Sequence, residues 1–432
     1  MRPGARIKAA AEVLQDILER HRPAAGALAD WGKAHRFAGS GDRSAIGTLV
    51  YDALRRKSSI AACMGEDAPR ALALGAAVRG FGMTADEVAA AADGSEHAIA
   101  PLSDEEKERL AAELPDDAPA HVKGDIPDWL ADSFARAFGD RAAEEGAALS
   151  ARAPVDLRVN TLKADREKVL KALTRFGAEA TPWSPSGVRV PAPQGAARSP
   201  AVEAETGHGK GWFEVQDEGS QLAALLAGAG PRQQVLDLCA GAGGKTLAMA
   251  AGMHNTGQIY AYDADKRQLR PIFERLKRAG ARNVQVMDAG DQDALAALGE
   301  RFDLVLVDAP CTGSGTWRRK PDSKWRLKPA NIPERQAEQT RVLDAGAALV
   351  KPGGRLVYVT CSVLPEENVD QVAAFVSRNS AFAVEPYPEV WRAQLGSEPP
   401  ASADGREDTL QLTPAQHATD GFFIALLRRS TG

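Results

Sequence analysis

The sequence predicts an α/β protein whose C-terminal half is a doubly wound, mostly parallel sheet, preceded by a small α+β module and an all-helical region. From Trp212 onward, short apolar strands alternate with helices, which is typical of repeated βα units. Residues 119–205 combine three predicted helices with two strands, and residues 1–118 carry apolar side chains at helical spacing. A chain of 432 residues is long enough for two or three domains, here 1–118, 119–205 and 206–432.

The individual elements follow from the spacing of the apolar residues. Helices are predicted at 6–22, 44–56 (capped by Ser44) and 66–90 in the first region, and at 127–138, 141–151 and 166–176 in the small module. The strands of the module are predicted at 155–159 and 188–190. In the last region the strands are 235–238, 258–262, 283–287, 304–307 and 355–359, and the helices are 245–252, 267–279, 294–298 and 333–349.

Composition excludes several classes of protein. Hydrophobic residues make up 44% and charged residues 26%, as in a soluble globular protein, and no apolar run approaches the roughly 20 residues that a membrane span needs. The N-terminus lacks the apolar segment of a signal peptide. The four cysteines show no CxxC spacing and no paired histidine, so we expect no disulfide framework, no metal site and a reducing, cytoplasmic location.

The net charge of −5 hides a local asymmetry. Residues 1–59 hold 11 Lys and Arg against 6 Asp and Glu, whereas residues 85–150 hold 5 against 17. A nucleic-acid footprint is a local basic patch, so the overall charge neither supports nor excludes a nucleic acid as partner.

The stretch FDLVLVDAPCTGSGT, residues 302–316, organises the predicted sheet domain. An apolar run rich in β-branched residues ends at Asp308 and is followed by Cys311 and a loop of Gly, Ser and Thr. Because an open α/β sheet binds ligands at the carboxyl ends of its strands, both side chains are candidates for a site there.

A glycine-rich turn, VLDLCAGAGGKT at residues 235–246, follows the first strand of this domain. Gly241, Gly243 and Gly244 allow the backbone to approach a ligand closely. The motif is neither a phosphate-binding P-loop nor a complete GxGxxG, and a tight turn without a ligand is the alternative for this motif alone.

Acidic residues follow the next two strands. Asp263 lies about 20 residues beyond the turn, where a carboxylate can bind two hydroxyls of a ribose. Asp265 competes for this role, but it also suits the N-terminus of the following helix. Asp288, after the third strand, is a candidate contact of an adenine amino group. Each alone suits a turn or cap residue, but three strand ends in sheet order favour a ligand that contains adenosine.

Cys311 and Cys361 each follow an apolar strand and adjoin polar turns, in DAPCTGSGT and YVTCSVLPEEN. A nucleophilic thiol needs partial exposure and a lowered pKa, which suits these two positions better than a buried structural role. Cys63, in an apolar helix, and Cys239, in the glycine-rich turn, are expected to pack without acting as nucleophiles.

The segment WRRKPDSKWRLK, residues 317–328, holds six basic residues against one Asp, with Trp317 and Trp325 between them. Its cations are expected to contact phosphates, and its indoles to stack on bases. A solvated basic face, with a tryptophan that anchors the loop, is the rival interpretation.

At these motifs the chain resembles the Sun/Fmu (RsmB-like) family of S-adenosylmethionine-dependent RNA cytosine-5 methyltransferases. The resemblance extends from about residue 120 to the end and rests on LRVNTLK (157–163), FEVQDEGSQ (213–221), LDLCAGAGGKT, DAPCTGSGT with RRKPDSKW, and TCSVLPEEN. It implies a Rossmann-like methyltransferase domain, a small RRM-like RNA-binding module and an N-terminal helical domain similar to the RNA-binding protein NusB. The chain departs from the family at Ala242, where proline is common, and in a helical domain shorter than a full NusB domain.

The resemblance also implies the site residues. Cys361 is the expected nucleophile, which adds to carbon 6 of cytosine, Cys311 is expected to help release the adduct, and Asp308 to support protonation at N3. The implied contacts of S-adenosyl-L-methionine are Cys239, Ala240, Gly241, Ala242, Gly243, Gly244, Lys245, Asp263, Asp288 and Asp308. Lys245 is also a candidate for the active centre, with the direction of its side chain left open. The target base has to be unpaired or flipped into the pocket.

The predicted function is methylation of cytosine carbon 5 in RNA by a cytoplasmic, metal-free monomer, with small-subunit (16S) ribosomal RNA as the expected substrate. The same chemistry on tRNA is the nearest alternative. A catalytically idle RNA-binding assembly factor is the alternative from a different class, and a DNA cytosine methyltransferase would use the PC-motif cysteine as its nucleophile.

Overall fold

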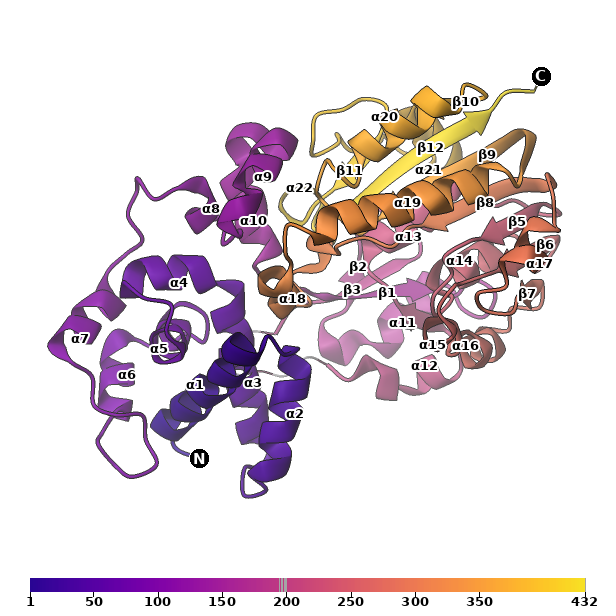
Figure 1. Cartoon of the computed structure of the whole chain (residues 1–432). Coiled ribbons are helices and arrows are strands. Elements are labelled where there is room, and N and C mark those ends of the chain that lie inside the picture. Colours follow the sequence, from indigo (N-terminus) through magenta and orange to yellow (C-terminus); the bar gives the residue numbers. More distant parts are fainter. Residues whose placement is uncertain (194, 196, 198–199, 432) are drawn as a thin grey trace. The chain divides into compact units, whose positions relative to one another are not determined.

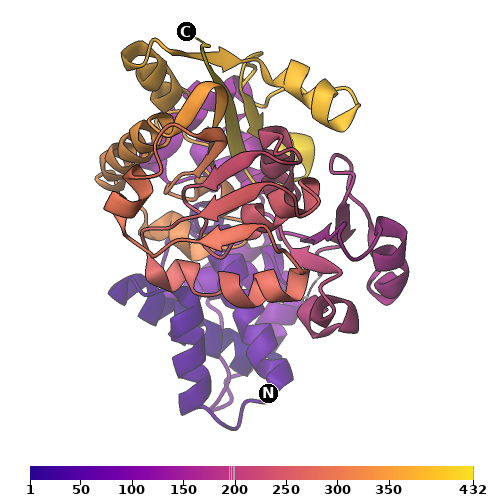
Figure 2. The ribbon, with the colours of Figure 1, turned by 90° about the vertical axis from the view of Figure 1, so that its right-hand side faces the viewer.

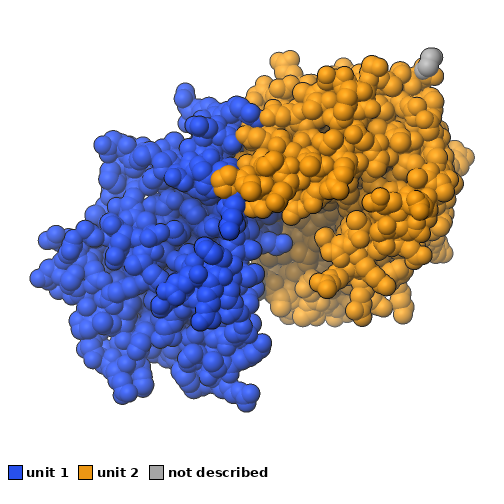
Figure 3. Space-filling model, in the orientation of Figure 1, with its two compact units in different colours: residues 1–152, 193–199, 316–328 blue, residues 153–192, 200–315, 329–432 orange. Residues whose placement is uncertain are grey.

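The structure, a computed structural model, describes residues 1–193, 195, 197 and 200–431. The chain forms two compact units (Figure 3), of which unit 1 comprises residues 1–152, 193–199 and 316–328, and unit 2 comprises 153–192, 200–315 and 329–432. No helix in the described part of the chain is both long and apolar enough to cross a lipid bilayer. The division into three domains at residues 118 and 205 stays a prediction, and by packing residues 153–192 belong to unit 2.

Unit 1 is helical (Figure 1). Its helices are α1 (Pro3–Arg20), α2 (Ala24–Ala34), α3 (Ser40–Arg55), α4 (Lys57–Met64), α5 (Pro69–Arg79), α6 (Ala85–Ala91), α7 (Asp104–Ala111), α8 (Ala120–Lys123), α9 (Ala131–Phe138), α10 (Ala142–Leu149) and α18 (Pro321–Arg326), with 3-10 turns at Asp128–Leu130 and Gly139–Arg141. The apolar faces of α1, α3 and α5 form its core, in which Leu14, Val50 and Leu72 are buried. The helix predicted at 44–56 begins earlier, after the N-cap Gly39, so the prediction that Ser44 caps it is wrong.

The basic segment at 317–328 lies within unit 1. Trp317 is only 1% exposed, and its indole stacks on Phe134 with ring centroids 5.8 Å apart. Trp325 packs against the helical core and donates its Nε1–H to the carbonyl oxygen of Leu54 at 2.6 Å. The prediction that the indoles stack on RNA bases is therefore wrong for Trp317, whose ring is buried, and stays a prediction for Trp325, whose ring is only partly buried.

Unit 2 contains a small antiparallel sheet with strand order β2-β3-β1-β4. Its strands are β1 (Val155–Val159), β2 (Glu179–Ala180), β3 (Gly187–Val190) and β4 (Phe213–Val215), accompanied by α11 (Arg166–Ala172), α12 (Thr206–Gly209) and 3-10 turns at Thr174–Phe176 and Val202–Ala204. Leu157, Val169 and Val188 pack between α11 and the sheet. β1 has the limits predicted from the sequence, whereas β4 lies beyond the predicted boundary at residue 205.

The second sheet of unit 2 has eight strands in the order β10-β12-β9-β8-β5-β6-β7, with β11 paired to β12. The strands are β5 (Gln234–Asp237), β6 (Gln258–Ala261), β7 (Val284–Val286), β8 (Phe302–Asp308), β9 (Val350–Thr360), β10 (Phe382–Glu385), β11 (Leu410–Leu412) and β12 (Phe422–Arg429). β5 to β9 are parallel, as predicted, and β10 to β12 add antiparallel pairs that the prediction did not contain. The chain order reverses between β5 and β8, which is the switch point where doubly wound sheets bind ligands.

Helices cover both faces of this sheet (Figure 2). α13 (Glu218–Ala227), α14 (Gly244–Gly252) and α21 (Tyr387–Leu395) share one face, and α17 (Gln292–Ala296), α19 (Asn331–Ala347) and α20 (Val369–Arg378) the other. Successive residues of β8 alternate between the faces, with Leu304 and Leu306 on the first and Val305 and Val307 on the second. The helix predicted at 267–279 is divided at Pro271 into α15 (Lys266–Leu269) and α16 (Ile272–Ala279), and α22 (Pro414–His417) precedes β12.

Candidate active site

The carboxyl ends of neighbouring parallel strands bring the predicted residues together at one edge of the sheet. Asp308 is the last residue of β8, and Cys361 follows the last residue of β9. β8 pairs in parallel with both β5 and β9, so these strand ends are adjacent. The glycine-rich turn leaves β5 at this same edge and leads into α14.

Two glycines of the turn adopt a left-handed backbone, with φ of 50° at Gly241 and 81° at Gly243. The amide of Gly241 donates to Oδ2 of Asp263 at 2.8 Å, so the carboxylate that follows β6 holds the turn. A Cβ on Gly243 would lie 2.5 Å from Cγ1 of Ile272, which shows how closely α16 approaches. The other oxygen of Asp263 accepts from the amide of Asp265, whose own side chain caps α15.

The turn is also held by two arginines. Arg275 of α16 donates to the carbonyl oxygen of Ala242 at 2.9 Å. Arg158 of β1 donates to Oε1 of Gln216 at 2.6 Å and to the carbonyl oxygen of Gly244 at 3.4 Å. Burial lowers the pKa of Arg158 to about 10. The small sheet therefore supports the glycine-rich turn directly through a side chain of the LRVNTLK motif.

Lys245 and Asp308 form an ion pair, with 2.6 Å between Nζ and Oδ2. The Lys245 side chain is almost fully buried and that of Asp308 is 33% exposed. Nζ of Lys245 also lies 5.3 Å from the centre of the Phe422 ring. The direction of Lys245, which the sequence left open, is thus toward the carboxylate at the end of β8.

Asp237, the last residue of β5, is a buried carboxyl that the sequence analysis missed. Its Oδ2 accepts from the hydroxyl of Thr246 at 2.6 Å, and within the described part of the chain its Oδ1 has no hydrogen-bond partner. Burial, together with the charges of Asp308 and Asp263, raises its pKa to about 7. The available signal was its position within the VLDLCAGAGGKT motif, at the end of the strand and two residues before Cys239.

The two thiols named from the sequence are neighbours, because Sγ of Cys311 lies 3.4 Å from Sγ of Cys361. The hydrogen bond to Cys361, burial, and the charges of Cys361 and Glu367 raise the pKa of the Cys311 thiol well above its usual value. Burial, with Asp308 and Asp263 nearby, likewise raises the pKa of Cys239. Cys63 is buried in α4 of unit 1, as expected.

The remaining predicted residues lie farther out or act through the backbone. Ala240 is buried, and its amide donates to the carbonyl oxygen of Tyr262 at 2.9 Å. Asp288 is exposed beyond β7, two strands from β5. Within the described residues no group of His, Cys, Asp and Glu has the arrangement of a metal site, and the absence of a metal stays a prediction.

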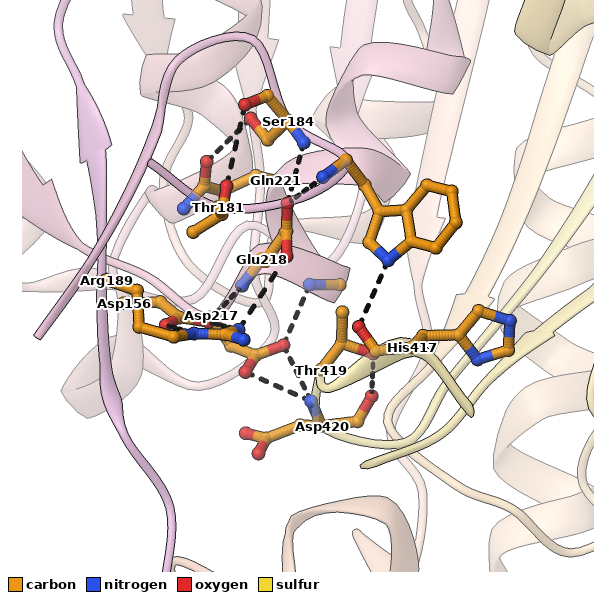
Figure 4. A network of polar contacts seen from close by, with 12 residues as sticks. Asp156, Thr181, Ser184, Arg189, Asp217, Glu218, Gln221, His417, Thr419 and Asp420 are labelled. Atoms are coloured by element: carbon orange, nitrogen blue, oxygen red, sulfur yellow. Dashed lines mark hydrogen bonds and ion pairs between the residues drawn. The ribbon is translucent and has the colours of Figure 1, made fainter. Parts of the chain in front are cut away.

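A polar network joins the small sheet to the large one within unit 2 (Figure 4). Arg189 of β3 binds both oxygens of Asp156 of β1 at 2.7 Å, and Asp156 accepts from the amide of Glu218 at 3.1 Å. Asp217 accepts from the amide of Asp420 at 3.0 Å. The next residue, Gly421, donates to the carbonyl oxygen of Gly315 at 2.8 Å. The network thus ends at the loop that carries Cys311.

The site fits an adenosine-containing methyl donor with a positive sulfonium. Three carboxyls, those of Asp237, Asp263 and Asp308, lie within electrostatic reach of one another beside the glycine-rich turn. A cation relieves their mutual repulsion, and the close backbone of the turn leaves room for a ligand. A doubly wound sheet with this turn, these acids and two adjacent thiols defines a Rossmann-like methyltransferase.

Comparison with known proteins identifies the family. Residues 224–428 match the model of the 16S rRNA methyltransferase RsmB/F family, and residues 126–196 match its ferredoxin-like domain. The chain is 34% identical over 310 residues to the "Probable ribosomal RNA small subunit methyltransferase B" of Synechocystis sp. The aligned region covers 71% of this chain and 67% of that protein. The chain belongs to the RsmB/F family, and S-adenosylmethionine is its methyl donor.

Solved structures agree with this assignment. The structure of PH0851 superposes with a TM-score of 0.73 and 27% identity, covering 99% of both chains. A methyltransferase homologue from Pyrococcus horikoshii gives a TM-score of 0.59 and 30% identity, covering 72% of this chain and 97% of its own. The chain spans about two thirds of the curated relatives that it matches, with 66% and 65% for two further examples. The predicted family and Rossmann-like fold are confirmed.

Proposed function

We propose that this protein methylates carbon 5 of a cytosine in small-subunit ribosomal RNA, in the cytoplasm and as a monomer, through a covalent bond between Cys361 and the base. The observation that carries the proposal is the 3.4 Å separation of the Cys311 and Cys361 sulfurs beside the Lys245–Asp308 pair. Cytosine carbon 5 is a weak nucleophile, and two thiols next to a methyl donor supply what its activation and later release require.

The proposed reaction begins with Cys361. Its thiol first loses a proton to solvent. The thiolate then forms a bond to carbon 6 of the ring, the electron pair of the C5–C6 double bond moves toward carbon 5, and N3 takes a proton from solvent, with Asp308 stabilising the protonated ring. Carbon 5 then takes the methyl group, and the donor sulfur keeps the electron pair of the broken bond.

Release restores the aromatic ring. Carbon 5 loses its proton to solvent, N3 returns the proton that it took, and the bond between Cys361 and carbon 6 breaks with its electrons on sulfur. The thiol of Cys311, 3.4 Å away, donates a hydrogen bond to that sulfur as the negative charge returns to it.

Aromatic side chains on unit 1 support RNA contact by the helical region. Phe37 is 74% exposed, its ring meets that of His35 edge-on at 5.8 Å, and His35 stacks on Trp31 at 4.2 Å. Arg36 and Lys33 are exposed beside these rings. Stacked rings among cations are the features that bind unpaired bases and their phosphates, so we assign this rim, residues 31–37, to RNA.

Trapping of the covalent adduct tests the proposal. The whole protein is incubated with S-adenosylmethionine and small-subunit rRNA that contains 5-fluorocytidine, because fluorine at carbon 5 prevents release. Wild type, Cys311→Ser and the control Cys63→Ser are expected to give a band on a denaturing gel, and Cys361→Ser none. A band lost in Cys311→Ser but kept in Cys361→Ser would reverse the two roles, and stronger trapping on tRNA would replace the substrate.

A further inference from the structure

A buried carboxylate outside the predicted site binds both cysteine loops. Glu367 lies between β9 and α20 and is fully buried. Its oxygens accept from the Thr312 amide at 2.8 Å, the Thr312 hydroxyl at 2.5 Å and the Ser362 hydroxyl at 2.5 Å. A fourth bond, at 3.0 Å, comes from Nε2 of Gln339. All four donors are neutral groups, so these bonds solvate the carboxylate without cancelling its charge.

The residues that Glu367 binds are the immediate neighbours of the two thiols. Thr312 follows Cys311 and Ser362 follows Cys361, so a single side chain bridges the loop after β8 and the loop after β9. Further bonds between these loops run from the Gly315 amide to the Cys361 carbonyl oxygen at 2.9 Å, and between the Ser314 and Ser362 hydroxyls at 2.9 Å. Glu367 is thus one of the groups that hold the two cysteine loops together.

We propose that Glu367 is a positioning residue that fixes the separation of the two thiols and keeps the proton of the pair on Cys311, which reserves Cys361 as the nucleophile. The inference rests on the proposed function, which gives Cys361 the role of nucleophile and Cys311 the role of release thiol. The separation of the two sulfurs and the position of the proton do not depend on methyl transfer.

The charge of Glu367 acts on the thiol of Cys311. It is one of the causes that raise the pKa of Cys311, after the hydrogen bond to Cys361, burial and the charge of Cys361. Tyr358 also faces this group, and its hydroxyl donates to the carbonyl oxygen of Glu367 at 2.7 Å. Asp308 precedes Cys311 by three residues on the same strand end. When the pair ionises, the proton remains on Cys311 and its S–H donates to the Cys361 thiolate.

The first test measures each thiol by itself in the whole protein without RNA. Alkylation by iodoacetamide is followed across pH, and mass spectrometry separates the peptides of Cys311 and Cys361. In Glu367→Gln, which keeps the shape but removes the charge, the alkylation midpoint of Cys311 is expected to fall by about one pH unit, equal to roughly tenfold faster reaction below the midpoint. An unchanged Cys311 midpoint in a folded Glu367→Gln protein overturns the electrostatic role.

The matched variant is Thr312→Val, which removes one hydrogen bond to Glu367 but leaves its charge in place. Its Cys311 midpoint is expected to match wild type, while the rate of adduct formation on 5-fluorocytidine RNA falls several-fold because the loop is less firmly held. An equal shift of the Cys311 alkylation midpoint in Glu367→Gln and Thr312→Val would show that the charge of Glu367 is not the cause, and would leave Glu367 only a role in packing. Should Glu367→Gln fail to fold, an unchanged adduct rate in Thr312→Val refutes the positioning role instead.

The adduct assay separates failure of this inference from failure of the proposed function. If wild type traps no RNA, the proposed function fails, and the alkylation profiles still decide the part of Glu367. If wild type traps RNA only through Cys361, Glu367→Gln is expected to form a detectable share of its adduct through Cys311. An adduct that remains entirely on Cys361, with an unchanged rate, overturns the inference.

Discussion

Replacement of Gly243 by alanine tests whether the close packing of α16 against the glycine-rich turn requires a residue without a side chain at this position. At φ of 81° a Cβ is strained, and this one would lie 2.5 Å from Cγ1 and 2.8 Å from Cδ1 of the buried Ile272. The left-handed backbone costs about 1–2 kcal/mol for a residue with a side chain, and forcing an atom into a packed core costs about 1–3 kcal/mol more. The expected loss in free energy of unfolding is therefore roughly 2–5 kcal/mol.

Two neighbouring glycines separate these contributions. Gly241 has φ of 50° but nothing within 4 Å of an added Cβ, so Gly241→Ala is expected to lose only the backbone part, about 1–2 kcal/mol. Gly244 begins α14 without a left-handed φ, and its added Cβ would meet Nε2 of Gln216 at an ordinary 3.5 Å. Gly244→Ala should be neutral or slightly stabilising, because alanine favours a helix over glycine by about 0.5–1 kcal/mol.

Urea unfolding of the three variants gives the order of their free energies of unfolding. Calorimetric titration with S-adenosylmethionine reports whether the turn still binds the methyl donor. Gly243→Ala is expected to be the least stable and to bind the donor most weakly, since α16 has to move away from the turn. Equal stability of Gly243→Ala and Gly241→Ala would refute the steric reasoning, because the clash with Ile272 is what distinguishes them.

Two further predictions concern unit 1. Burial lowers the pKa of Lys324 to about 7. Between pH 7 and about 10 the unfolded chain therefore holds a proton on this side chain that the folded unit lacks. The free energy of unfolding should rise with pH across this window, because the unfolded state binds more protons. Lys324→Met should remove that rise in pH-dependent urea unfolding, and an identical slope in the variant would contradict it. Phe37→Ala should weaken binding of single-stranded RNA, measured by fluorescence anisotropy, by about 1–3 kcal/mol. The control is Phe273→Ala, which removes another phenyl ring that is 59% exposed. An equal loss of RNA affinity in both variants would exclude a specific role of the rim.

The sequence was sufficient for the sheet edge because strand ends are a local property. Apolar runs that stop at Asp308 or before Cys361 mark where parallel strands deliver polar side chains, and parallel pairing then brings those ends together. The proximity of the two sulfurs, at 3.4 Å, follows from β8 and β9 being neighbours in the sheet. Motif resemblance supplied what pattern alone did not, namely the chemistry assigned to each thiol.

The failures have the opposite origin, because they depend on what a segment packs against. Trp317 lies in a basic stretch that is expected to be exposed at the surface. Its ring is nevertheless buried against Phe134, which is distant in sequence. Ser44 suits a cap by its residue type, but the helix extends one turn further to Ser40 because the backbone there remains helical. The role of Glu367 is not predictable from the sequence, because an acidic turn after a strand is normally solvated and only the tertiary structure shows its buried bonds to both loops.

The charges at the sheet edge place a constraint on how RNA and methyl donor share the site. Asp263 and Asp308 favour a cationic sulfonium and repel phosphate, a bound cation favours the ionised form of Asp237, whose pKa is about 7, and the cation of Lys245 is already paired to Asp308. Two unit charges 4 Å apart interact by about 4 kcal/mol at the effective dielectric near a protein surface, so a phosphate in this pocket would be disfavoured. A cytosine ring carries no such charge. Under the proposed function, the base therefore has to enter extended away from its backbone, which is the geometry of a flipped nucleotide.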